Sequence, residues 1–336
     1  MVCMADRACQ TPNMRYAITG ATGFLGGVLA LQLAAAGHDV VAAVRSPRKS
    51  ARLLNAGIQV VPADLADTEG LTSAFEGADG VFHVAGWYHV GAKDPTEGDR
   101  VNVEGTRHVL AAAAAAGVRR MVHTSTCAVN SDTHGEVVDE TYEFRGKHIS
   151  EYDRTKAEAH YIVLDYAAAH DLPEVVVVMP GGIYGPGDTS QVGTLMRDVA
   201  AGKRVIATSR LRMMQAYVAD VAYGHLLAMT EGVAGESYML TGERTNLHAL
   251  LTEVARLTGG VTPIDIPGIV LPVAQVLTGV VGRVHGLPPE FTAESMRVSQ
   301  ASYLGTSAKA ERELGWTYRG LSEGLAQTVS TYPKSR

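Results

Sequence analysis

Short aliphatic runs recur along the first half of the chain, and longer stretches of mixed polarity separate them. An unbroken aliphatic run is typical of a strand that is buried on both faces. Buried strands are therefore expected at residues 16–19, 40–44, 59–61, 81–84, 121–124 and 175–179. Helices are expected at residues 24–36, 101–116 and 152–169. Strands and helices that alternate in this way predict a parallel sheet with helices on both faces.

Crossover connections between parallel strands are right-handed, so this order predicts a doubly wound α/β sheet of the Rossmann type. After residue 181 the pattern loosens: glycine and proline cluster at residues 181–187, and the helices expected at 247–257 and 309–314 follow irregular stretches. We therefore expect a dinucleotide-binding domain over residues 14–180, to which later segments return. A smaller C-terminal substrate-binding region, partly interleaved with it, is expected over residues 181–330.

The composition narrows the class of protein. Of the 336 residues, 46% are hydrophobic and 19% are charged, which is typical of a soluble globular protein with a sizeable core. The formal net charge of −6 argues against a general nucleic-acid-binding surface. The spacing of Cys3, Cys9 and Cys127 suits neither a metal site nor a disulfide framework, so a reducing cytoplasm is the expected location.

No segment predicts a membrane span. Residues 1–13 lack the apolar stretch of a secretory signal. The most apolar late segment, residues 269–281, is shorter than the about 20 residues that a spanning helix needs. We interpret it as a buried helix, with contact at a membrane surface as the alternative. The expected partner is a small-molecule substrate, with no metal, nucleic acid or membrane.

A glycine-rich segment joins the first expected strand to the first expected helix. Free N–H groups and the positive end of a helix at such a turn bind a pyrophosphate. Gly20 permits the tight turn, Gly23 lets the phosphates approach, and Gly26 lets the helix pack closely on the strand. The spacing G-x-x-G-x-x-G differs from the standard dinucleotide fingerprint, and no Gly-Lys-Ser or Gly-Lys-Thr follows as in a P-loop. The alternative is a glycine-rich turn that binds no ligand.

The end of the second expected strand indicates which nicotinamide cofactor is preferred. NAD-binding sites usually place an acidic residue there for the ribose 2′-hydroxyl. This chain has Arg45 instead, with Arg48 and Lys49 close behind. A guanidinium pairs with a 2′-phosphate, so NADP is favoured and NAD is the second choice. The alternative is a solvated basic loop. Asp64 ends the next strand and could accept a hydrogen bond from the adenine amino group.

A tyrosine and a lysine lie four residues apart at the start of an expected helix. This spacing puts Tyr152 and Lys156 on one face. A nearby ammonium favours the phenolate and lowers a tyrosine pKa that is otherwise about 10, too high for proton transfer near neutrality. The hydroxyls of Ser125 and Thr126 follow a buried strand and could hold a substrate carbonyl. Together these residues indicate a catalytic constellation.

With these motifs the chain resembles the extended short-chain dehydrogenase/reductase family, which includes the NAD-dependent epimerases and dehydratases. The resemblance covers nearly all of the chain beyond Arg15 and is nearest to the dihydroflavonol-reductase-like and hopanoid-associated epimerase-like branch. The matching motifs are Gly20-x-x-Gly23-x-x-Gly26, Asp64-Leu65, Phe82-His83-Val84-Ala85, Asn102-Val103-x-Gly105-Thr106, residues 124–126, Tyr152 with Lys156, Pro180-Gly181-x-Ile183-Tyr184-Gly185-Pro186-Gly187, Val218-x-Asp220-Val221 and Glu313-Leu314-Gly315-Trp316.

The resemblance implies roles for these residues. Tyr152 would be the general acid/base, Lys156 would bind the nicotinamide ribose, and Thr126, with Ser125 as the alternative, would contact the substrate. The residues that the resemblance implies for cofactor binding are Gly20, Thr22, Gly23, Phe24, Leu25, Gly26, Arg45, Asp64, Leu65, Val84, Ala85, Tyr152, Lys156, Pro180 and Ile183.

The sequence also departs from its nucleotide-sugar relatives. They usually carry an Arg-Asp-Phe-like stretch before the Val-x-Asp motif, and this chain has Arg212-Met213-Met214-Gln215-Ala216-Tyr217 there. Trp87 and Tyr88 could line a site for an apolar or ring-shaped substrate. The alternative is that they form a packed aromatic pair.

Three functional hypotheses remain open. The first is NADPH-dependent reduction of a ketone or aldehyde, or the reverse alcohol oxidation, and the second is an epimerase or dehydratase with tightly bound NAD. The third is a non-catalytic NADP-binding sensor, which the intact pair of Tyr152 and Lys156 argues against. Arg45 and the missing arginine motif favour the first. A homodimer is expected because the alanine-rich helices at 101–116 and 152–169 correspond to those that pair in relatives.

Overall fold

The computed structural model describes residues 13–92, 94–265 and 292–333. The first twelve residues, with Cys3 and Cys9, and the helix expected at 269–281 lie outside the described residues. No helix in the described part of the chain is long and apolar enough to cross a membrane.

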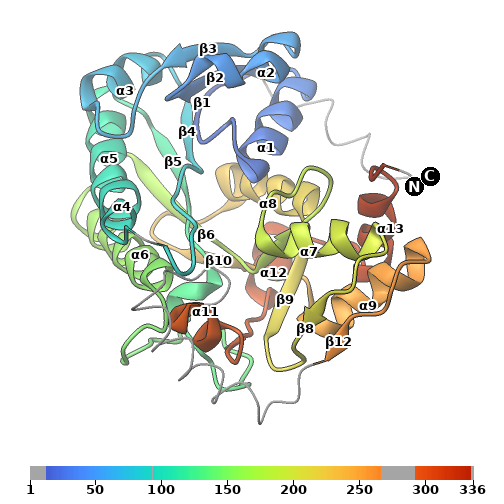
Figure 1. The fold of residues 1–336 in the computed structure, drawn as a ribbon. Helices are drawn as coiled ribbons and strands as arrows, with labels where there is room; N and C mark the ends of the chain where they lie inside the picture. The colour runs from blue at the N-terminus through green and yellow to red at the C-terminus, as the bar shows by residue number, and fades with distance from the viewer. Residues whose placement is uncertain (1–12, 93, 266–291, 334–336) are drawn as a thin grey trace.

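A seven-stranded parallel sheet forms the centre of the molecule (Figure 1). The strand order is β10-β6-β5-β4-β1-β2-β3, which confirms the expected doubly wound Rossmann topology. Six of these strands are the six aliphatic runs, and the seventh comes from beyond residue 181. The strands are β1 (Arg15–Thr19), β2 (Asp39–Val44), β3 (Gln59–Pro62), β4 (Gly80–His83), β5 (Arg120–Thr124), β6 (Glu174–Pro180) and β10 (Ser237–Leu240).

Helices cover both faces of this sheet (Figure 1). Alternate strand residues face opposite layers: Ile18 packs in the core on one face of the sheet, whereas its neighbour Ala17 packs in the core on the other face. On the first face lie α1 (Phe24–Ala35), α8 (Val218–Glu231) and α12 (Ala308–Leu314). On the second lie α3 (Thr68–Phe75), α5 (Gly105–Ala115) and α6 (Glu151–Ala169).

The helix expected at 101–116 begins differently in the structure. Its first part is a π-helix, η2 (Asp99–Glu104), which continues into α5. Asn102 in this wider turn accepts a hydrogen bond from the Trp87 backbone N–H at 2.7 Å and donates one to the Thr155 hydroxyl at 3.0 Å. One amide therefore ties the segment after β4 to α6. The other short helices are η1 (Pro47–Lys49), α2 (Ala51–Asn55), α4 (Thr96–Gly98) and η3 (Cys127–Asn130).

A second, smaller assembly packs beside the carboxyl edge of the main sheet (Figure 1). Its centre is β9 (Arg212–Tyr217), which pairs with β7 (Gly182–Tyr184), β11 (Glu243–Asn246) and β13 (Ser302–Tyr303). These short strands were not expected, because their pairing joins segments far apart in the chain. The remaining elements are α7 (Gln191–Ala200), β8 (Ile206–Ala207), α9 (Leu247–Thr258), β12 (Ile264–Asp265), α11 (Ala293–Val298) and α13 (Leu321–Val329).

Candidate active site

The glycine turn after β1 is shaped so that only glycine fits. Gly20 has a φ of +77°, and a Cβ there would lie 2.6 Å from the backbone nitrogen of Ala85. A Cβ at Gly26 would collide with the Gly20 carbonyl oxygen. Helix α1 begins after Gly23 without a side-chain cap, so its first N–H groups are available to an anion. This turn therefore fits a dinucleotide pyrophosphate.

The residues expected to bind the adenosine end lie along the same edge of the sheet. Arg45 follows β2 and is exposed, and Asp64 follows β3, where its Oδ1 accepts a hydrogen bond from the Ala66 N–H at 3.0 Å. Val84 and Ala85 follow β4 and are partly buried. Because the carboxyl ends of parallel strands meet at one edge, these residues surround the glycine turn.

Lys156 is buried at the end of β5. Its side chain projects from α6, is 6% exposed as a residue, and donates a hydrogen bond from Nζ to the Thr124 carbonyl at 2.7 Å. Burial lowers the pKa of Lys156 to about 8, so the ammonium still predominates at neutral pH.

Tyr152 stands one turn before Lys156 on α6 and is partly buried. Its ring meets the Tyr88 ring edge-on, with the centroids 4.8 Å apart. Burial raises the pKa of Tyr152, and a hydrogen bond with the Thr126 hydroxyl acts in the opposite direction. The phenol therefore stays protonated at neutral pH and can serve as a proton donor.

The two hydroxyl residues after β5 have different surroundings. Thr126 lines the cavity next to Tyr152 and caps η3, where its Oγ1 accepts from the Ala128 N–H at 3.2 Å. Ser125 is 4% exposed, and its Oγ lies 2.9 Å from Nδ1 of the buried His160. The structure thus brings Thr126 to the cavity and turns Ser125 into the core.

Four buried histidines lie around the end of β5. His225 Nδ1 is 2.8 Å from the Val221 carbonyl, which can only accept, so Nε2 accepts the hydrogen bond from the Thr124 hydroxyl at 3.0 Å. His83 links the hydroxyls of Thr19 and Thr106 at 2.8 and 3.2 Å. Burial lowers the pKa of every member of the group, which comprises His83, His123, His160 and His225.

A cavity of about 300 Å³ opens beside Tyr152. It lies between α6 and the smaller assembly, so its far wall comes from β7, β9, β13 and α11. The apolar side chains that line it are Phe24, Val90, Ile183, Leu211, Met213 and Val298. The polar side chains that line it include Tyr88, Thr126, Tyr152, Asp153, Gln215 and Tyr303.

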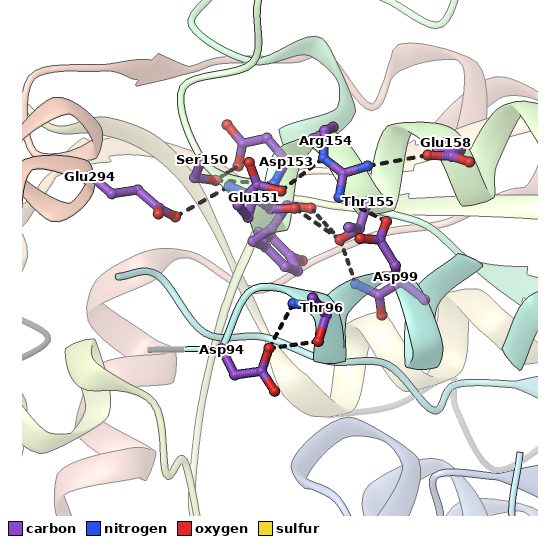
Figure 2. Close-up of polar contacts among 12 residues, drawn as sticks. Asp94, Thr96, Asp99, Ser150, Glu151, Asp153, Arg154, Thr155, Glu158 and Glu294 are labelled. Atoms are coloured by element: carbon purple, nitrogen blue, oxygen red, sulfur yellow. Dashed lines mark hydrogen bonds and ion pairs between the residues drawn. The ribbon is translucent and has the colours of Figure 1, made fainter. Parts of the chain in front are cut away.

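Polar contacts hold the first turn of α6 in place (Figure 2). Ser150 caps the helix, with its Oγ accepting from the Asp153 N–H at 3.0 Å. Arg154 forms an ion pair with Asp99 of η2 at 2.7 Å, and a carboxylate oxygen of Glu294 in α11 accepts from the Glu151 N–H at 3.2 Å (Figure 2). The first turn of α6 is therefore tied to segments that precede and follow it in the chain.

Asp153, next to Tyr152, is a buried carboxyl group. It is 1% exposed and accepts hydrogen bonds from the Ser150 hydroxyl at 2.7 Å and the Tyr303 hydroxyl at 3.1 Å. Burial raises the pKa of Asp153 to about 7, although both hydrogen bonds oppose this shift. At neutral pH the group is thus close to its own midpoint.

Trp87 and Tyr88, which were both expected to contact the substrate, differ in their exposure in the structure. Tyr88 is 51% exposed and lines the cavity. Trp87 is 5% exposed and packs against Gly98, where a Cβ would come within 3.1 Å of its ring. The expectation for Trp87 is therefore corrected: its backbone is held by Asn102, which turns the indole into the protein interior.

Other residues near the cavity were not singled out from the sequence. Asp153 adjoins Tyr152, but nothing in the sequence shows that it is buried. Tyr303 lies 150 positions further along the chain, and His160 and His225 sit on helices that only the fold brings to β5. Gln215 belongs to the stretch that departs from the nucleotide-sugar relatives, which was the one available signal.

Comparison with known proteins places the chain in a family. The family model described as the NAD dependent epimerase/dehydratase family matches residues 16–241, which include the glycine turn and the pair of Tyr152 and Lys156. The chain belongs to this family. As an epimerase/dehydratase family protein of the extended short-chain dehydrogenase/reductase type, it is a nicotinamide-dependent enzyme, and the alternative of a non-catalytic sensor has no support.

Two curated relatives of this chain are named as reductases. A putative dihydroflavonol 4-reductase of Synechocystis sp. is 32% identical over 331 residues, covering 94% of this chain and 93% of the relative. A 4-hydroxy-2-methyl-3-oxo-4-farnesyl-3,4-dihydroquinoline-1-oxide ketoreductase of Stigmatella aurantiaca is 34% identical over 315 residues, covering 91% and 92%. The crystal structure of gox2253 superposes with a TM-score of 0.79 at 30% identity, covering 95% of this chain and 97% of that one.

Proposed function

We propose that this enzyme reduces a ketone on a bulky apolar ring system, or oxidises the corresponding alcohol, with NADP(H) as its cofactor. The observation that carries the proposal is the apolar wall of the cavity beside Tyr152. A nucleotide-sugar substrate would need cations for its diphosphate, whereas the described residues that line this cavity include two aspartates and neither lysine nor arginine. The names of the two reductase relatives agree with this substrate class.

The residues of the chain divide the chemistry between them. Thr126 would donate a hydrogen bond to the substrate carbonyl, and Tyr152 would donate its proton to the same oxygen as the alcohol forms. The buried ammonium of Lys156, held by the Thr124 carbonyl, would stabilise the phenolate that remains. When bound, NADPH supplies the hydride for the carbonyl carbon.

The cofactor would lie along the carboxyl edge of the sheet. The turn at Gly20, Gly23 and Gly26 would hold the pyrophosphate, and Lys156 would bind the nicotinamide ribose. Arg45 is exposed at the end of β2, where it is free to pair with a 2′-phosphate, so NADP is our first choice and NAD the second. Pro180 and Ile183 would lie against the nicotinamide.

We also propose that the enzyme is a homodimer. Helices α5 and α6 lie side by side on one face of the sheet, and Tyr161 on α6 is 43% exposed. The exposed alanines of α5 would allow close approach of a second copy. Light scattering at micromolar concentration should report twice the 35.5 kDa mass of the chain; a monomer would contradict the proposal.

The reaction class can be tested with purified enzyme. We expect mass spectrometry to find no tightly retained NAD in the purified enzyme. With 1-tetralone or a steroid ketone as substrate, we expect the enzyme to oxidise NADPH faster than NADH. UDP-glucose should give neither an epimer nor a dehydrated product. Retained NAD together with conversion of the nucleotide sugar would instead establish the epimerase or dehydratase alternative.

A further inference from the structure

Residues 124–126, at the end of β5, are each contacted by a different turn of α6. Lys156 donates a hydrogen bond to the Thr124 carbonyl at 2.7 Å, and Tyr152 shares one with the Thr126 hydroxyl. In the proposed reaction both of these hydroxyls must reach one substrate oxygen, although one belongs to a helix and the other to the turn after a strand. Their relative position therefore depends on how firmly α6 is joined to this turn.

A buried histidine makes the contact between α6 and the middle residue of the turn. Nδ1 of His160 lies 2.9 Å from the Ser125 hydroxyl oxygen, and the two residues are 6% and 4% exposed. His160 follows Lys156 by four positions and Tyr152 by eight, so the three side chains lie along one face of the helix. Because the Ser125 backbone N–H also donates to the Val178 carbonyl of β6 at 2.7 Å, this residue is fixed at both its backbone and its side chain.

The contact lies behind the cavity rather than in it. Neither His160 nor Ser125 is among the described residues that line the cavity, whereas Thr126, the next residue in the chain, lines it. The Thr126 hydroxyl has few restraints of its own: its Oγ1 accepts from the Ala128 N–H at 3.2 Å and lies 3.5 Å from the Pro180 carbonyl oxygen. Its position therefore depends on the backbone that Ser125 anchors.

Two other buried histidines near β5 make contacts of a different kind. His83 lies between the hydroxyls of two threonines outside this turn, and His225 contacts Thr124 from α8 on the other face of the sheet. Neither of them joins α6 to the turn. His160 is uncharged near neutral pH, because burial and the nearby Lys156 ammonium lower its pKa to about 4. It therefore acts through its hydrogen bond and not through a charge.

We propose that His160 is a positioning residue, whose hydrogen bond with Ser125 sets the distance between the Thr126 and Tyr152 hydroxyls. His160 itself would touch neither the substrate nor the cofactor. The inference rests on the proposed function, in which both hydroxyls act on one carbonyl oxygen. Loss of the contact should slow the chemical step and leave cofactor binding intact, because only the alignment of the two donors is disturbed.

The main test replaces His160 by side chains that differ in hydrogen bonding. His160→Phe keeps a planar ring without the nitrogen, so kcat for reduction of 1-tetralone with NADPH should fall roughly tenfold as the two donors lose their alignment. The dissociation constant of NADPH, measured by fluorescence titration, should stay within about twofold of wild type. His160→Asn places an amide near the position of Nδ1, where it can donate or accept, and should restore most of kcat.

Ser125→Ala removes the other partner of the contact by deleting one oxygen atom. It should reduce kcat by about as much as His160→Phe, and the double variant should lose no more than either single variant, because both substitutions break the same contact. Circular dichroism and thermal melting establish that each variant is folded. Ser125→Ala also keeps the proposal testable if His160→Phe does not fold.

His38→Phe is the matched control. His38 is another buried histidine, 9% exposed, and it precedes β2 at the opposite edge of the sheet from the cavity. A loss of thermal stability that comes from replacing any buried histidine should appear in both His38→Phe and His160→Phe. Only His160→Phe should lose kcat.

The outcomes separate this proposal from the proposed function. Wild-type kcat in folded His160→Phe, equal losses in His160→Phe and His160→Asn, or losses that multiply in the double variant overturn the role of His160. If wild-type enzyme reduces no ketone, the proposed reaction fails, and crystal structures decide the role of His160. A Thr126 hydroxyl that moves away from Tyr152 in Ser125→Ala then supports this role, and one that stays in place overturns it.

Discussion

The two walls of the active site are built in different ways. The catalytic wall consists of short contiguous motifs at the carboxyl ends of neighbouring strands, such as the turn from Gly20 to Gly26 and the first turns of α6. The opposite wall is assembled from β7, β9, α11 and β13, whose segments are spread along the chain between Gly182 and Tyr303. The residues proposed to carry out the reaction are therefore encoded locally, whereas those proposed to select the substrate are brought together by long-range pairing.

The walls also differ in their ionisable groups. Behind the catalytic wall lie Lys156 and four buried histidines, all with pKa values lowered by burial. The apolar side chains of Leu211, Met213 and Val298 line the opposite wall. This difference predicts that the rate and the pH response depend on the first wall and substrate choice on the second.

The strongest test of this division is the removal of the proton donor. Tyr152→Phe should reduce kcat for ketone reduction by about 10²–10⁴-fold, because the ring packing against Tyr88 remains while the transferable proton is lost. Tyr223→Phe, on α8 and exposed, is the matched control and should be close to wild type. Near-normal turnover by Tyr152→Phe would show that the proton comes from another group.

Acidification should destabilise the fold through the catalytic wall. His83, His160 and His225 have folded-state pKa values of about 3, 4 and 4, below the unfolded value of 6.5, so they favour the folded state above pH 6.5 and lose this contribution as pH falls. At pH 5 the loss is about 2 kcal/mol for each histidine.

Urea unfolding of His225→Gln measures one share of this effect. Between pH 7 and pH 5 the free energy of unfolding should fall for both proteins. The fall should be about 2 kcal/mol smaller for His225→Gln than for wild type. His134→Gln provides the control because His134 is a solvent-exposed histidine, with 81% of its side chain accessible. If His225→Gln and wild type lose the same stability, buried neutral His225 is not the source of acid sensitivity.

The next largest effect is expected at Arg45, at the end of β2. Arg45→Ala should weaken NADPH binding roughly ten- to a hundredfold and NADH binding much less, because only the 2′-phosphate loses a charge-assisted hydrogen bond worth about 1.5–3 kcal/mol. Fluorescence titration gives both dissociation constants. Arg48→Ala, in the adjacent η1, should show a smaller and more salt-sensitive loss. Equal losses for the two cofactors would mean that Arg45 points to solvent.

The smallest effect is expected where the two walls meet. The charge of Asp153, which accepts a hydrogen bond from Tyr303 of the opposite wall, contributes to the raised pKa of Tyr152. Asp153→Asn should therefore lower the pKa of Tyr152, and the rising limb of kcat/KM for alcohol oxidation, in which Tyr152 must accept a proton, should move to lower pH. Tyr303→Phe keeps the carboxyl group and serves as the comparison. An unshifted profile in Asp153→Asn would show that the charge is not sensed by Tyr152.

Sequence patterns sufficed where interactions are local. Six strands of the main sheet, the helices α1, α5, α6 and α12 that pack on it, the glycine turn and the spacing of Tyr152 and Lys156 were predicted, because hydrophobic period and turn chemistry are properties of short segments. Helices α3 and α8, which also cover the sheet, were not predicted. The strands of the smaller assembly were not, because β7, β8, β12 and β13 are too short to show a period and are stabilised only by partners distant in the chain.

By itself, then, the sequence determined the doubly wound fold and the nicotinamide class of cofactor, and it predicted Tyr152 and Lys156 as the catalytic pair. The tertiary structure decided that Thr126 faces the cavity while Ser125 meets His160, and that Tyr88 is exposed there while Trp87 is packed away. It also placed Gln215, Asp153 and Tyr303 in one cavity. Adjacent residues of like chemistry cannot be told apart by composition or spacing, because burial and direction depend on the elements that pack against each side chain.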